Sequence, residues 1–168
     1  MPPVAERSRP TKGSRPDPVA WTAEALGTGR MQRLQPSMGA AGEMVNPART
    51  HLQSADLIAG TDPTLAVSTC HDAARQAISA HMRAAGYRVA NEAGAHRFVL
   101  DYASVVLAGV VSEDDIVALD DLRRDRHTAE YGDFASKTIT TERARQALEL
   151  ATRVVASVAK TLAEQSKQ

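Results

Sequence analysis

Cysteine, aromatic residues and long apolar runs are all scarce in this sequence. Cys70 is the single cysteine among 168 residues, which excludes an internal disulfide framework and a zinc site built from several cysteines. Aromatic residues make up 4% of the chain, which disfavours a platform on which single-stranded nucleic acid would stack. No apolar run approaches the ~18 residues of a membrane-spanning helix, and the N-terminus lacks the apolar stretch of a signal peptide. We therefore expect a cytoplasmic protein that does not enter a membrane.

Charge and proline are unevenly distributed, although the net charge is zero. Residues 1–50 hold seven of the basic and four of the acidic residues, together with seven of the eight prolines. This composition predicts a disordered leader rich in Pro, Arg and Gly over residues 1–43, with a short helix near 19–26 that could dock through Trp21. The leader could also be a basic arm that contacts RNA or a partner, or upstream sequence translated from an early start codon.

From residue 46 onward the sequence predicts helices with clear start and stop signals. Asn46 followed by Pro47 is a preferred helix start, and this helix would run to Gly60. Asp62 followed by Pro63 repeats the signal for a second helix, which Gly86 would end in the left-handed conformation. Small residues dominate the apolar face of this second helix, so a neighbouring helix could approach closely.

Three more helices follow, and no segment shows the alternation of a strand. The third starts near Ala95, the fourth begins at a capping box formed by Ser112 and Asp115, and the last begins near Thr140. The last helix has an apolar residue every three or four positions, as expected for a helix in a bundle: Ala144, Leu148, Ala151, Val155, Val158 and Leu162. We predict an all-α, antiparallel four- to five-helix bundle over residues 46–166.

An arginine interrupts the apolar stripe of the fourth helix. Helical steps from Leu119 and Leu122 lead to Arg126, where a core or interface residue is expected. A buried guanidinium needs an anion, a carboxylate or an interface, so Arg126 is a candidate ligand for phosphate, or else pairs with Glu130 one turn on. His127 and Tyr131 lie one turn apart near this arginine. A histidine there could move a proton near neutral pH.

Three segments in order resemble the HEPN domain, a helical-bundle module of prokaryotic toxin–antitoxin and defence systems. They are CHDAARQAISAHMRAAGYRV in the second helix, NEAGAHRFVLDY with His96 at the start of the third, and LDDLRRDRHTAEYGDF, which is similar to the family's motif of an arginine followed by a histidine. On this resemblance Arg126 takes the position of the motif arginine, and Tyr131 stands where the motif histidine is expected.

The resemblance implies an activity and partners as well as a fold. Active HEPN proteins are metal-independent endoribonucleases that work as homodimers, so catalytic roles are implied for Arg126, His127 and Tyr131. Binding roles are implied for Glu130, His96 and Arg123, with RNA or a nucleotide as ligand and no cofactor. A cognate antitoxin or a nucleotidyltransferase is a further expected partner, although Asp133 stands where some members carry a tyrosine that such a partner modifies. A phenol is a poor base at pH 7, although it can donate a hydrogen bond or act as an acid.

Other polar groups have simpler interpretations. Acidic residues of the fourth helix occupy several of its faces, which favours a solvated surface paired with arginines over a metal site: Glu113, Asp114, Asp115, Asp120, Asp121 and Asp125. His71 and His81 do not share a face of the second helix and make a poor metal pair. His81 is expected in the core with a partner, and Cys70 is expected to be buried and inert.

Three hypotheses about function follow. The chain is an endoribonuclease with a variant motif, a dimeric module that binds RNA, a nucleotide or a protein partner without turnover, or a plain helical adaptor in which Arg126 pairs with Glu130.

Overall fold

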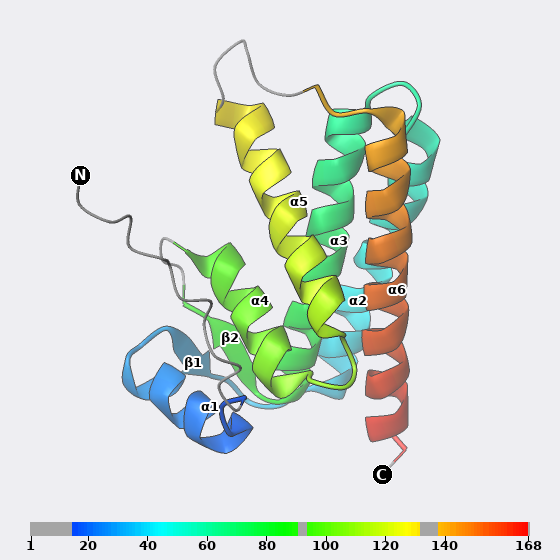
Figure 1. The fold of residues 1–168 in the computed structure, drawn as a ribbon. Coiled ribbons are helices and arrows are strands. Elements are labelled where there is room, and N and C mark those ends of the chain that lie inside the picture. Colours follow the sequence, from blue (N-terminus) through cyan, green and yellow to red (C-terminus); the bar gives the residue numbers. More distant parts are fainter. Residues whose placement is uncertain (1–14, 91–93, 132–137, 168) are drawn as a thin grey trace, which may run out of the picture.

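A computed structural model of the chain describes residues 15–90, 94–131 and 138–167, and for residues 126–131 it describes the backbone alone. This part of the chain forms an all-α bundle with a two-stranded sheet at one end (Figure 1). The order is α1 (Pro18–Gly27), β1 (Met31–Arg33), α2 (Met38–Ile58), α3 (Pro63–Ala84), β2 (Tyr87–Val89), α4 (Ala95–Val106), α5 (Glu113–Tyr131) and α6 (Thr141–Gln165). The predicted fold class is confirmed.

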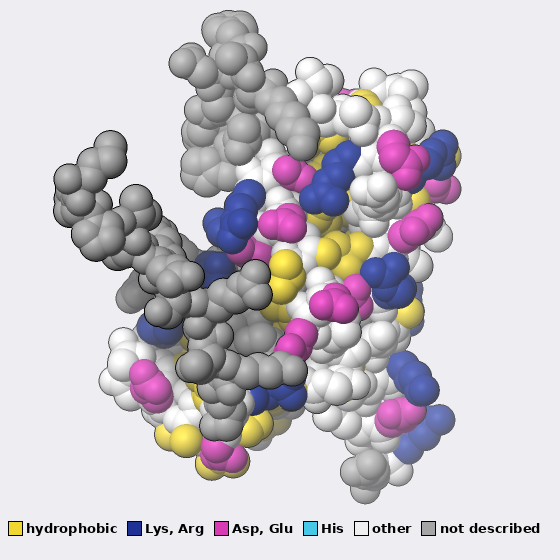
Figure 2. Space-filling view, viewed as in Figure 1, with side chains coloured by type: hydrophobic (Ala, Val, Ile, Leu, Met, Phe, Trp, Pro, Cys, Tyr) yellow, Lys and Arg dark blue, Asp and Glu magenta, His cyan; other side chains and the backbone are white. Residues whose placement is uncertain are grey.

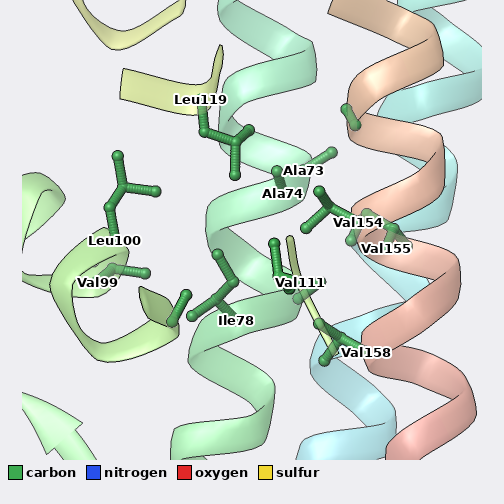
Figure 3. Close-up of a cluster of buried hydrophobic side chains, with 14 of the residues drawn as sticks. Ala73, Ala74, Ile78, Val99, Leu100, Val111, Leu119, Val154, Val155 and Val158 are labelled. Atoms are coloured by element: carbon green, nitrogen blue, oxygen red, sulfur yellow. The ribbon is translucent and has the colours of Figure 1, made fainter. Parts of the chain in front are cut away.

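Helix α3 is the centre of the bundle and packs against α2, α4, α5 and α6. Its buried face is rich in alanine, as expected for a helix that its neighbours approach closely: Ala66, Ala73, Ala74, Ala77 and Ala80. Figure 3 shows Ala73, Ala74 and Ile78 of α3 between the valines of α6 and Leu119 of α5. The predicted stripe of α6 lies in this core, with Leu148 only partly buried.

Local capping signals predicted most helix ends correctly. The Asp62 carboxylate accepts from the backbone N–H of Leu65 at 2.9 Å, and Gly86 takes the left-handed conformation just after α3, with φ of 84°. The Ser112 hydroxyl accepts from the backbone N–H of Asp115 at 3.1 Å, and Thr140 caps α6 in the same way. Each of these signals lies within a few residues of the end that it sets.

The start of α2 differs from the prediction. The helix begins at Ser37, whose hydroxyl accepts from the N–H of Ala40 at 3.1 Å, and Pro47 lies inside it rather than at its start. A proline inside a helix forfeits one backbone hydrogen bond. Burial of Ala41, Val45 and Ala48 against the bundle offsets that cost, because helices in proteins gain most of their stability from tertiary packing.

The expectation of a disordered leader over 1–43 is wrong for residues 15–43, while residues 1–14 lie outside the described residues. Helix α1 docks on α4 through Trp21, which stacks on Phe98 with ring centroids 5.3 Å apart. Strand β1 pairs antiparallel with β2, and Met31 is 1% exposed. Burial of these apolar side chains outweighs the proline and glycine content. The strands, three residues each, are too short for alternation to reveal them.

Candidate functional site

Helix α5 carries most of the residues predicted to form a site. Leu119 and Leu122 are fully buried, so the apolar stripe is confirmed as far as Leu122. The backbone stays helical to Tyr131. The side chains of Arg126, His127, Glu130 and Tyr131 lie outside the described residues, so their roles stay predictions.

The buried carboxylate of Asp120, six residues before Arg126 on α5, accepts hydrogen bonds from three arginines. Asp120 is 8% exposed. Its carboxylate accepts from Nε of Arg123 at 2.8 Å, from Nη2 of Arg124 at 2.7 Å and from Nη1 of Arg97 at 3.2 Å. Arg97 belongs to α4, so this contact joins the two helices. Arg123, predicted as a binding residue, is thus held by its Nε against Asp120.

The arginines set the charge state of this cluster. Burial tends to raise the pKa of Asp120, but the hydrogen bond from Arg123 and the charges of Arg97, Arg123 and Arg124 outweigh it, so the pKa lies below its usual value. The hydrogen bond to Asp101 is the main cause that raises the pKa of Arg97. Asp120 is therefore a carboxylate at neutral pH.

Four other acidic residues on α5 also pair with arginines. Figure 2 shows acidic and basic side chains interspersed over the face of α5 and α6, with hydrophobic side chains between them. The pairs join Asp115 to Arg153, Asp125 to Arg143, Asp121 to Arg124 and Glu113 to Arg15. The predicted pairing of Asp120 and Asp121 with Arg124 is confirmed, but Asp120 is buried rather than solvated.

A pocket of about 330 Å³ lies between α4 and α5. Apolar side chains and the charged groups of the Asp120 cluster share its lining, which includes Leu100, Ile116, Val117, Arg97, Asp120 and Arg124. The guanidinium groups on its wall are suited to bind a phosphate or carboxylate, because each offers paired N–H donors in one plane.

His96, predicted as a binding residue, lies at the start of α4 and is exposed. Its ring stacks on that of His71 from α3, with centroids 5.9 Å apart and planes 13° from parallel. His71 is 1% exposed, and neither ring nitrogen has a hydrogen-bond partner within the part of the chain that the structure describes. Its Nδ1 lies 3.8 Å from a carboxylate oxygen of Asp72.

The sequence considers His71 only as an unlikely metal partner of His81, and its contact with His96 of α4 depends on two different helices. The two histidines have different neighbours. His81 has Nδ1 3.0 Å from the hydroxyl of Tyr102, and burial lowers the pKa of His81 and raises that of Tyr102. His81 is therefore the partnered core histidine that the sequence predicted.

The geometry defines a helical bundle with an arginine-rich α4–α5 face. A family model described as the HEPN domain matches residues 42–162, so the chain belongs to the HEPN family. No curated protein and no solved structure matches the chain. Within the described residues no helix is both long and apolar enough to cross a membrane.

Proposed function

We propose that this HEPN protein binds RNA at the α4–α5 face and cuts it as a metal-independent endoribonuclease. The observation that carries the proposal is the pocket between α4 and α5. Its wall includes the guanidinium groups of Arg97 on α4 and of Arg124, which precedes Arg126 by two residues on α5. Arg126 would add a further guanidinium on the same helix. Arginines gathered in this way can hold successive phosphates of an RNA backbone.

The proposed reaction needs no external reagent. The 2′-hydroxyl of one nucleotide attacks the adjacent phosphorus, the O2′–P bond forms and the P–O5′ bond breaks, which leaves a 2′,3′-cyclic phosphate and a 5′-hydroxyl. Arg126 holds the phosphoryl oxygens, on which negative charge develops. His127 takes the proton of the 2′-hydroxyl as the O2′–P bond forms. Tyr131 donates a proton to the departing 5′-oxygen, a role open to a phenol.

A second copy of the chain is the proposed partner. Helix α5 begins with three acidic residues and carries arginines near its other end, at Arg123, Arg124 and Arg126. Two such helices packed antiparallel about a two-fold axis would place each acidic end against the basic end of its partner. A cognate antitoxin or nucleotidyltransferase could bind the same face.

The test is cleavage of purified total RNA in the presence of EDTA by the full chain and by Arg126→Ala. Arg145→Ala, which removes the same charge from an exposed position of α6, is the matched control. We expect cleavage by the wild type and by Arg145→Ala, loss with Arg126→Ala, and 2′,3′-cyclic phosphate ends on the products. Circular dichroism checks that all three proteins are folded. If the wild type leaves the RNA intact, the proposed endoribonuclease activity is wrong.

A second candidate is RNA binding without turnover, which Tyr131 at the position of the motif histidine favours. In that case the wild type leaves RNA intact yet binds a fluorescent oligoribonucleotide, and Arg126→Ala weakens this binding. Arg145→Ala binds as the wild type does. If neither cleavage nor binding is seen, Arg126 and Glu130 form a structural pair and the chain is a helical adaptor.

A further inference from the structure

The two-stranded sheet carries arginines whose charge no carboxylate balances. Arg33 ends β1, Arg88 lies in the middle of β2, and Arg83 lies in the last turn of α3 just before β2. None of the three forms an ion pair in the part of the chain that the structure describes. The arginines that line the α4–α5 pocket, by contrast, each bond to a carboxylate.

Neutral partners hold two of these guanidinium groups in place. Nε of Arg88 donates to the side-chain oxygen of Gln32 at 2.8 Å, and the two residues face each other across the sheet. The guanidinium of Arg33 lies over the ring of Tyr87, its own partner in the register, with Cζ 5.8 Å from the ring centroid. Such contacts orient a cation without cancelling its charge, so the positive potential remains available to a ligand.

The third guanidinium belongs to the same fixed end of the sheet. Arg83 donates through Nη1 to the backbone carbonyl of Gln35, just after β1. The N–H of Leu34 donates to the carbonyl of Gly86 at 2.8 Å, and a Cβ at Gly86 would lie 2.9 Å from the carbonyl oxygen of Leu34. Because glycine permits this close approach and its φ of 84°, the backbone that carries the three arginines is held in one arrangement.

Further arginines continue from the sheet to the α4–α5 face. Figure 1 shows the sheet beside α4. At the other end of the sheet the N–H of Ala90 donates to the carbonyl of Arg30 at 3.0 Å, three residues or about 10 Å along the strand from Arg33. Arg30 and Arg97 line a pocket of about 140 Å³ between the sheet and the start of α4, and Arg97 also lines the α4–α5 pocket.

We propose that the β1–β2 sheet is a second binding surface for RNA, on which Arg33, Arg83 and Arg88 hold phosphates outside the α4–α5 site. A guanidinium offers paired N–H donors that fit a phosphate, and an RNA strand presents a phosphate at every nucleotide. An acidic protein segment would meet the same charges, but the continuous path of arginines to the α4–α5 pocket favours one long strand. The identity of this polyanion rests on the proposed function, whereas the sheet takes no part in the reaction itself.

The experiment measures binding of the full chain, in EDTA, to a fluorescent 2′-O-methyl oligoribonucleotide of about sixteen nucleotides, which cannot be cleaved because it lacks the attacking hydroxyl. Each phosphate contact contributes about 0.7 to the slope of log K against log salt concentration for a single strand. We expect Arg33→Gln/Arg88→Gln to lower this slope by about 1.4 and to raise Kd by about 10- to 30-fold at ~0.1 M salt. Adding Arg83→Gln should lower the slope by about 0.7 more.

Arg145→Gln/Lys160→Gln is the matched control. It removes the same two charges from exposed positions of α6, while Arg33 and Arg88 are exposed positions of the sheet. We expect the control to bind with the wild-type slope, and thermal unfolding checks that both double variants are folded. Equal losses in the two double variants would assign the effect to the overall charge of the chain and overturn the inference.

Cleavage of natural RNA separates this inference from the proposed function. Because the sheet arginines do not touch the reacting atoms, Arg33→Gln/Arg88→Gln should raise KM and leave kcat unchanged. If this variant binds the probe with the wild-type slope while the wild type cleaves RNA, the second surface is wrong and the endoribonuclease stands. If the wild type does not cleave but its binding depends on Arg33 and Arg88, turnover is wrong and the second surface stands. A wild type that does not bind the probe overturns the second surface.

Discussion

The guanidinium of Arg97 on α4 donates to the buried carboxylate of Asp120 on α5, with Nη1 3.2 Å from Oδ2. Arg123 and Arg124 of α5 donate to the same carboxylate. Asp120 thereby joins the two helices that line the pocket. It also holds three arginine side chains together, six residues before Arg126 on α5. It contributes to the stability of the bundle and to the geometry of the candidate site together.

Substitution Asp120→Asn should lower the free energy of unfolding by about 1–3 kcal/mol, because it leaves three arginines around a neutral amide. Asp121→Asn is the control: Asp121 is 51% exposed and pairs with Arg124 at 3.5 Å, so we expect a change within about 0.5 kcal/mol. Urea unfolding monitored by circular dichroism measures both. Equal effects would contradict a special role for Asp120.

The contribution of Asp120 should also depend on pH. Because its pKa is lower in the folded state than in the unfolded chain, its stabilisation is complete above the unfolded value of about 4 and is lost as the pH falls through the folded pKa. The difference in stability between the wild type and Asp120→Asn should be constant from about pH 5 to 7 and should shrink below about pH 4. A difference that shrinks near neutral pH would assign the effect to another group.

The docking of α1 predicts a second effect on stability. Trp21 stacks on Phe98 and meets Tyr102 edge-on with centroids 6.2 Å apart. Trp21→Ala should cost about 2 kcal/mol, less than for a fully buried tryptophan, because Trp21 is only partly buried. Val19→Ala, at a position 77% exposed on the same helix, should change little. A neutral Trp21→Ala would show that α1 adds nothing to the stability of the bundle.

Gly86 and Gly94 have similar backbone angles but different surroundings. Substituting each by alanine therefore distinguishes the cost of backbone strain from the cost of a steric clash. Gly86 has φ of 84°, and a Cβ there would lie 2.8 Å from Cγ of Pro36 and 2.9 Å from the carbonyl oxygen of Leu34. Gly94 has φ of 90° and open space around it. Gly94→Ala should cost about 1–2 kcal/mol from the backbone alone, and Gly86→Ala about 2–4 kcal/mol. Equal melting temperatures for the two variants would contradict an additional cost of steric contact at Gly86.

The sequence predicted those parts of the fold that depend on neighbours in the chain. Asp62, Ser112 and Thr140 mark helix starts because each side chain bonds a backbone N–H three residues on. The start of α2 and the docking of α1 depend on residues far apart. Burial of Ala41 and Ala48 outweighs the local signal of Pro47, and Trp21 finds its partner 77 residues away.

The candidate site was likewise predictable only where it depends on the sequence of a single helix. The apolar stripe and the family resemblance single out Arg126 from α5 alone. The stack of His71 on His96 joins two helices, and no periodicity within one helix could reveal it. Asp120 was read as solvated because its role depends on Arg97 from α4.

Cys70 gives a prediction about chemical reactivity. The thiol is fully buried, and burial raises its pKa to about 12. Because the thiolate is the reactive form, Cys70 in the folded chain should react with a disulfide reagent at pH 8 at least 1000-fold more slowly than an ordinary thiol, on the order of its reduced thiolate fraction. In urea the same thiol should react at once.

The slow reaction of the folded chain then reports how often the bundle opens, so Trp21→Ala and Gly86→Ala should accelerate it in proportion to their loss of stability. Rapid labelling of the folded wild type would contradict the burial of Cys70 in the core.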